Sequence, residues 1–143
     1  MIDIDIELSR PGFSLQARGK LEAEVTGLLG VSGAGKSTLL GIIAGYVQPE
    51  RGRVMLDGQS LVDTDRGIHV PMYQRRIGIV FQDSRLFPHM NVRDNLLYGL
   101  KLLPAKEQRF AYRQIVDLLE IGHLERSRGH VLSGGEKQRV ALG

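Results

Sequence analysis

The fold is decided by one stretch, Gly30-Val31-Ser32-Gly33-Ala34-Gly35-Lys36-Ser37, which matches the phosphate-binding loop pattern G-x-x-x-x-G-K-S at every position. Residues 24–29, which precede it, predict a buried strand, and residues 36–44 predict a helix that Gly45 ends. The motif requires a strand, a loop and a helix in this order. The sequence therefore predicts an α/β fold built around a nucleotide-binding loop.

The residue types in this stretch suit a triphosphate. Glycines let backbone N–H groups approach phosphate oxygens closely, and the N–H groups at the start of the following helix attract anions. Lys36 supplies a positive charge for the β- and γ-phosphates, and the Ser37 hydroxyl is the expected Mg²⁺ ligand. The alternative, an ordinary glycine-rich turn, is disfavoured by the flanking patterns. The predicted nucleotide-binding residues are Gly30, Val31, Ser32, Gly33, Ala34, Gly35, Lys36, Ser37 and Thr38.

Composition is that of an ordinary soluble domain. The chain has 143 residues, of which 42% are hydrophobic and 24% charged. The net charge of +3 is spread along the chain, so no nucleic-acid partner is predicted. The absence of cysteine excludes disulfides and thiolate metal sites. Without a long apolar run or a signal pattern, we expect neither a membrane span nor secretion by a signal of its own.

Two strands are predicted ahead of the loop, at 2–8 and 13–17, joined at Pro11-Gly12 into an antiparallel hairpin. Gly19-Lys20 is predicted to form the next turn. Phe13, in the second strand, either packs in the core or stacks on an adenine ring. The hairpin is expected to lead the chain into the nucleotide strand.

The middle of the chain predicts further strand structure. A short strand is expected at 53–56, between two turns, and the polar stretch 59–76 is expected to be surface structure. Residues 77–81 predict a second buried strand that ends at Gln82. A glutamine in this position can reach across a nucleotide site.

The pattern then becomes helical. Asn91 is a predicted N-cap with Asp94 at the third helical position. A longer helix is predicted from 104 to about 120, because Pro104 is a favoured first helical residue. Its predicted apolar face consists of Ala111, Ile115, Leu118 and Leu119.

This change of pattern marks a subdomain boundary near 82–89. We expect one domain, with a nucleotide-binding α/β core at 1–87 and a helical subdomain at 88–143.

The stretch 132–139 has two interpretations. As local structure, Ser133 and Glu136 form a capping box at the start of a helix. As a functional site, the N–H groups of Gly134 and Gly135 and the Ser133 hydroxyl form a second phosphate-binding surface. Two phosphate sites so far apart in one chain are most easily explained if two copies of the protein close on each nucleotide.

With these motifs in this order, the sequence resembles the ATP-binding cassette (ABC) transporter ATPases. Residues 30–37 match their Walker A loop, Gln82 their Q-loop and residues 132–138 their signature motif. Residues 30–36, 80–89 and 132–141 are most similar to the ATPase subunits of bacterial molybdate importers. The resemblance implies a P-loop NTPase of the ABC ATPase type, with an N-terminal antiparallel β part and a helical subdomain.

The resemblance also implies a site and its partners. ATP and Mg²⁺ are the implied cofactors, with Lys36 and Gln82 as catalytic residues and Ser37 and Gln82 as metal ligands. Two subunits are implied to form a head-to-tail homodimer, in which Ser133, Gly134 and Gly135 of one copy face the nucleotide of the other. The remaining implied partners are a transmembrane permease and, indirectly, a periplasmic solute-binding protein. The implied location is peripheral, on the cytoplasmic face of the bacterial inner membrane.

Several alternatives remain. Importers of sulfate, polyamines or iron have similar ATPases, and the solute is chosen outside this chain. A DNA-repair or chromosome-organising ATPase would carry a coiled coil or zinc insertion between Gln82 and Leu132, and this segment is too short for one. The chain ends at Gly143, before the positions of the family's Walker B strand, D-loop and switch histidine. We therefore expect the 143-residue chain to be inactive alone, which leaves a non-catalytic fragment as a further alternative.

Overall fold

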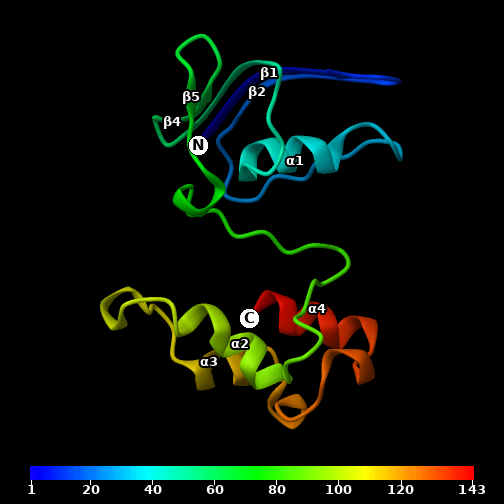
Figure 1. Cartoon of the computed structure of the whole chain (residues 1–143), viewed down its shortest axis with the longest axis vertical. Helices are drawn as coiled ribbons and strands as arrows, with labels where there is room; N and C mark the ends of the chain where they lie inside the picture. The colour runs from blue at the N-terminus through cyan, green and yellow to red at the C-terminus, as the bar shows by residue number, and fades with distance from the viewer. The chain divides into compact units, whose positions relative to one another are not determined.

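The computed structural model describes residues 1–143, apart from the side chain of Ala105. The chain forms two compact units, residues 1–79 and 80–143. The first contains all the named strands and one α-helix, and the second contains the other three α-helices (Figure 1). The predicted division of a single domain after residue 87 stays a prediction.

A five-stranded antiparallel sheet in the order β2-β1-β3-β4-β5 forms the first unit. Helix α1 (Lys36–Ala44) lies on one face of this sheet (Figure 1). The predicted hairpin is confirmed, and it turns at Pro11-Gly12 with a positive φ of 76° at Gly12. The strands are β1 (Ile2–Arg10), β2 (Phe13–Leu21), β3 (Arg51–Leu56), β4 (Gln59–Asp63) and β5 (Ile68–His69).

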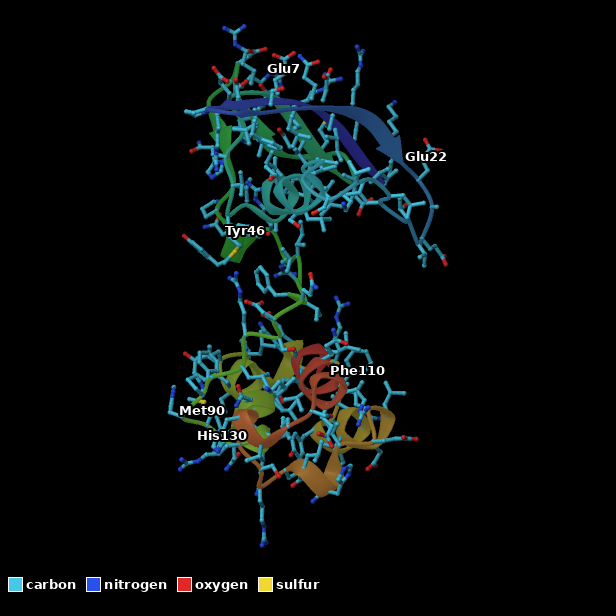
Figure 2. The ribbon with its side chains drawn as sticks, turned by 90° about the vertical axis from the view of Figure 1, so that its right-hand side faces the viewer. Glu7, Glu22, Tyr46, Met90, Phe110 and His130 are labelled. Atoms are coloured by element: carbon cyan, nitrogen blue, oxygen red, sulfur yellow. The ribbon has the colours of Figure 1, made fainter. Side chains whose placement is uncertain are left out.

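Alternation along β1 places the core of this unit between the sheet and α1. Ile4, Ile6 and Leu8 are buried, whereas Glu7 is exposed on the face turned away from α1 (Figure 2). Ile42 and Ile43 of α1 pack into the same cluster. Burial of this apolar face is what holds α1 on the sheet.

A predicted turn and a predicted surface stretch in this unit are wrong. Gly19-Lys20 is not a turn, because both residues lie inside β2 and pair with Ile4 and Asp3 of β1. The stretch 59–76 is not all surface, because β4 buries Leu61 and Val62. The stretch was predicted to be surface structure because most of its residues are polar, and Leu61 and Val62 are apolar exceptions among them.

The predicted strands at 24–29 and 77–81 are absent from the structure. Residues 22–30 are exposed chain without regular structure, with Val25 89% and Leu29 94% accessible to solvent. Residues 77–81 also lack regular structure. A strand needs a neighbour to pair its N–H and C=O groups, and none of the described strands pairs with either segment.

The second unit is helical. It contains α2 (Val92–Leu100), α3 (Tyr112–Leu118), α4 (Gly134–Leu142) and three short 3₁₀ helices, η2 (Ala105–Glu107), η3 (Gly122–Leu124) and η4 (Gly129–Val131). A fourth 3₁₀ helix, η1 (Met72–Gln74), belongs to the first unit. The predicted N-cap of α2 is confirmed, since Asn91 Oδ1 accepts the Asp94 N–H at 2.8 Å. The buried core residues of this unit are Val92, Val116, Ile121, Leu124, Leu132 and Val140.

The helix predicted from 104 to 120 is wrong in its first half. The Gln108 amide donates to the Leu100 and Leu103 carbonyls, both at 3.2 Å, and so holds this segment against the end of α2. Helix α3 begins only at Tyr112, where the Gln114 side chain accepts the Ala111 N–H at 2.9 Å. Its buried residue is Val116, whereas Leu118 of the predicted apolar face is exposed.

Candidate phosphate-binding site

The backbone of the loop turns through two glycines with positive φ. Gly33 and Gly35 have φ values of 82° and 88°, and the Ala34 N–H donates to the Val31 carbonyl at 3.2 Å. Gly35 is the N-cap of α1 and no side chain caps the helix. The N–H groups of its first turn are therefore available to an anion, and the helix dipole favours one there.

Lys36 is held inside the loop by the loop's own carbonyls. Its Nζ donates to the carbonyl oxygens of Gly30 and Val31, each at 2.8 Å. The side chain is half-buried at the first position of α1, so its ammonium lies against the backbone that precedes the helix. This arrangement holds one positive charge against the backbone of the loop.

The close approach of the loop to β2 requires glycine at position 35. A Cβ added there would lie 3.0 Å from Leu15 Cδ1 and 3.0 Å from Phe13 Cζ, in a backbone conformation that L-residues avoid. Phe13 is partly buried and packs against the core cluster of this unit. Of the two interpretations of Phe13, the structure therefore supports packing in the core. Side chains of β2 pack directly against the loop at Gly35.

Ser37 and Thr38 occupy the first turn of α1 beside Lys36. Ser37 is exposed and Thr38 is half-buried. A hydroxyl oxygen at this position is a hard ligand of the kind Mg²⁺ prefers, so the donor at Ser37 fits the predicted ion. The described residues contain no cluster of three or more His, Cys, Asp or Glu side chains that could hold a metal by themselves.

The other end of α1 is contacted by a buried arginine, Arg75, that the sequence patterns did not reveal. Arg75 donates from Nη1 to the carbonyls of Ile42 at 2.7 Å and Ile43 at 2.9 Å, and from Nε to the Val70 carbonyl at 2.7 Å. The helix ends at Gly45, whose φ is 99°. Arg75 lies in the stretch expected to be surface, and its only sequence signal is its position two residues before the apolar run 77–81.

Gln82 lies in the second unit, exposed and in a segment without regular structure. The residues after it form a tight turn with positive φ at Ser84 and Arg85, and the Arg85 guanidinium lies 3.8 Å from the centroid of the Phe81 ring. Asn95 ties the end of this segment to α2. Its Oδ1 accepts the Phe87 N–H at 2.8 Å and its amide donates to the Asn91 carbonyl at 2.9 Å.

The predicted capping box at α4 is present. The Ser133 hydroxyl and the Ser133 N–H both donate to Glu136 Oε2 at 2.7 Å, and the Glu136 N–H donates back to Ser133 Oγ at 3.4 Å. These hydrogen bonds hold the pKa of the Glu136 carboxyl below its ordinary value. Ser133, Gly134 and Gly135 are exposed, so a ligand can approach the start of α4.

Of the predicted site residues, those from Gly30 to Thr38 lie together in the first unit, at one turn of chain and the start of one helix. Gln82 and the residues from Ser133 to Gly135 belong to the second unit. Their contribution to a shared nucleotide site stays a prediction. No helix among the described residues is long and apolar enough to cross a membrane.

A phosphate-binding loop at the start of α1, an antiparallel β part and a helical unit with a capped glycine-rich helix start define an ABC-type ATPase domain. The chain matches the family described as "ABC transporter" over residues 19–143, and it belongs to that family. The solved structure of CbiO1 from Clostridium perfringens, described as part of the ABC transporter complex CbiONQ, is similar with a TM-score of 0.71 and 29% identity. That match covers 99% of this chain and 59% of the CbiO1 chain. The predicted ABC ATPase fold class is thereby confirmed.

Relatives of this chain are named molybdenum import ATP-binding protein ModC. The protein of that name from Mesorhizobium japonicum is 49% identical over 99% of this chain, and the one from Paramagnetospirillum magneticum is 44% identical over the whole of it. The chain spans 38% and 39% of the length of these two relatives. A dimeric ATP-binding cassette, MJ0796 bound to ADP and Pi, has the same fold with a TM-score of 0.71 at 24% identity.

Proposed function

We propose that this chain is the nucleotide-binding part of the ATPase subunit of a bacterial molybdate importer. The observation that carries the ATPase assignment is the loop from Gly30 to Ser37, with its two left-handed glycines, its enclosed lysine and the uncapped start of α1. The solute is supported by relatives named for molybdenum import that are 43% to 50% identical to this chain.

The loop would hold the nucleotide by exchanging internal contacts for phosphate contacts. The Lys36 ammonium now donates to two neutral carbonyls, and a β- or γ-phosphate oxygen offers a stronger, charge-assisted hydrogen bond. Backbone N–H groups at the start of α1 would donate to the same phosphates. The Ser37 hydroxyl would supply an oxygen ligand to Mg²⁺, which when bound neutralises charge that develops on the phosphates.

Hydrolysis and transport would require groups beyond this loop. Gln82 would contact the γ-phosphate and Mg²⁺, and Ser133, Gly134 and Gly135 of a second copy would donate to the γ-phosphate in a head-to-tail dimer. The permease would be contacted through the segment after Gln82, from which Phe87 remains 39% exposed beside Tyr98 at a ring-centroid distance of 4.6 Å. A solute-binding protein in the periplasm would deliver the solute to that permease. The assembly would sit on the cytoplasmic face of the inner membrane.

Uptake by a strain that lacks the gene for the full-length protein tests this proposal. Restoring the wild-type gene should restore molybdate uptake, and restoring a gene with Lys36→Ala should not. Sulfate, polyamine and iron uptake are measured in the same strains. Molybdate uptake that survives the deletion, together with loss of one of the other solutes, would show that the solute assignment is wrong.

A further inference from the structure

Arg75 is a buried charged residue with an unusual set of partners. Its side chain is 3% exposed, and among the described residues no carboxylate pairs with it. Instead its guanidinium donates to the Ile42 and Ile43 carbonyls of α1 and to the Val70 carbonyl. Its Nη2 atom is also buried and has no hydrogen-bond partner among the described residues.

This burial is costly, and the hydrogen bonds to three backbone carbonyls offset part of the cost. Removing a charge from water and leaving one of its donors unpaired both oppose folding. An apolar side chain of similar volume would avoid both effects, but it would take the donor away from the Ile42, Ile43 and Val70 carbonyls. Burial also lowers the pKa of the guanidinium. The carbonyl end of α1 offsets part of the cost, because it carries a partial negative charge.

A guanidinium at this place can do what an apolar side chain cannot. Its planar fork of donors joins the last turn of α1 to the segment just before η1 with fixed geometry. Gly45 closes around it, because a Cβ at position 45 would lie 2.6 Å from Arg75 Nε. Arg75 therefore fixes the C-terminal end of α1 relative to Val70, in addition to the core contacts of Ile42 and Ile43.

The orientation of α1 is decided at that end. Ile42, Ile43 and Ala44 are buried, whereas Ser37 at the opposite end is exposed and Lys36 is half-buried. The helix has nine residues and so is about 14 Å long, and a tilt that moves one end by about 1 Å moves the other end comparably. A change at Arg75 is thus passed to Lys36 and Ser37 by a rigid element.

We propose that Arg75 is a positioning residue for the phosphate-binding loop, which fixes the C-terminal end of α1 and thereby sets where Lys36 and Ser37 meet the phosphates and Mg²⁺. This inference rests on the proposed ATPase function. Arg75 does not touch the nucleotide. It acts through the helix that carries both contacting residues.

The test uses the full-length protein with Arg75→Lys and Arg75→Met, and with Arg76→Met as the matched control. Arg76 is the neighbouring residue and is exposed, so its change removes the same charge without touching α1. For each variant, circular dichroism measures the folded fraction, and ATPase rates give kcat, KM for Mg-ATP and the free Mg²⁺ concentration for half-maximal rate. The lysine variant keeps the charge but loses the planar fork.

We expect folded Arg75→Lys to raise KM about tenfold, to need more Mg²⁺, and to lower kcat by up to about a hundredfold, as misplacement by about 1 Å can do. Arg76→Met should match the wild type. A purely stabilising Arg75 would instead lower the folded fraction and leave KM and the Mg²⁺ requirement unchanged. That outcome, or loss of folding in both Arg75 variants, would overturn the inference. A wild-type protein that neither binds nor hydrolyses Mg-ATP would instead overturn the proposed function.

Discussion

Individual residues of the loop have separate tasks that their chemistry explains. Gly33 and Gly35 have φ values of 82° and 88°, a backbone conformation that residues with a Cβ avoid. Lys36 supplies the positive charge of the loop. Asn91 and Ser133 cap helices within three residues of themselves. These roles were predictable because each depends on neighbours in the sequence. The role of Arg75 was not, because its acceptors on α1 lie 32 and 33 residues away.

Glu136 gives the start of α4 a pH-dependent cap. Hydrogen bonds from the Ser133 hydroxyl and N–H lower its pKa in the folded protein relative to the unfolded chain. Its stabilising effect is therefore complete above the unfolded pKa and is lost as the pH falls through the folded pKa. We expect Glu136→Gln to speed amide hydrogen exchange in α4 at neutral pH and to match the wild type in stronger acid. A difference that stays constant across this pH range would contradict the assignment.

At the scale of elements, local pattern predicted the strands and helices whose partners lie nearby. The β1–β2 hairpin and α1 formed where expected, because the hairpin is closed by a tight turn and α1 is ended by Gly45. The segments 24–29 and 77–81 did not form strands. An apolar run becomes a strand only when a second strand pairs with it, and the residues of the run itself do not show whether such a partner is present. The segment 104–110 contains the short 3₁₀ helix η2 in place of an α-helix, and the Gln108 amide joins it to the Leu100 and Leu103 carbonyls.

Gly52 is the glycine on which the pairing of β1 and β3 depends. Its φ is 108°, and a Cβ there would collide with the Asp5 carbonyl oxygen of β1. We expect Gly52→Ala to lower the free energy of unfolding of the full-length protein by about 1–3 kcal/mol or more, because strain and a backbone clash add. Gly19→Ala is the control, since no atom lies within 4 Å of a Cβ added in that part of β2. Equal effects of the two changes in urea unfolding would show that the β1–β3 register tolerates a side chain at position 52.

At the scale of the whole molecule, the proposal requires two copies for each nucleotide. Ser133 is exposed at the start of α4 and its hydroxyl now donates to Glu136, so it can turn to a phosphate oxygen without unburying any group. The N–H groups that follow it add a positive helix end. Sequence order alone suggested this shared site, because the two motifs are too far apart in the chain for either to complete the other locally.

Ser133→Asp and Ser133→Asn separate the capping role from the phosphate role. Both replacements are good N-caps, but aspartate cannot donate to the Glu136 carboxylate as Ser133 does, so circular dichroism of each variant checks that α4 still forms. Only aspartate brings a negative charge toward the γ-phosphate. Light scattering of the full-length protein with Mg²⁺ and a non-hydrolysable ATP analogue should show a dimer for the wild type and for Ser133→Asn and a monomer for Ser133→Asp. Dimers of equal stability in all three would argue that Ser133 does not face the phosphate.

Equilibrium binding of Mg-ATP to the full-length protein, with Lys36→Ala beside Lys20→Ala, tests the central claim most directly. Lys20 is an exposed lysine of β2 outside the loop, so its change removes an equal charge from another place. Loss of one charge-assisted contact of about 1.5–3 kcal/mol should raise the Kd of Lys36→Ala roughly tenfold to a hundredfold. The Kd of Lys20→Ala should stay at the wild-type value. A Kd for Lys36→Ala equal to that of the wild type would show that the loop from Gly30 to Ser37 does not hold the nucleotide.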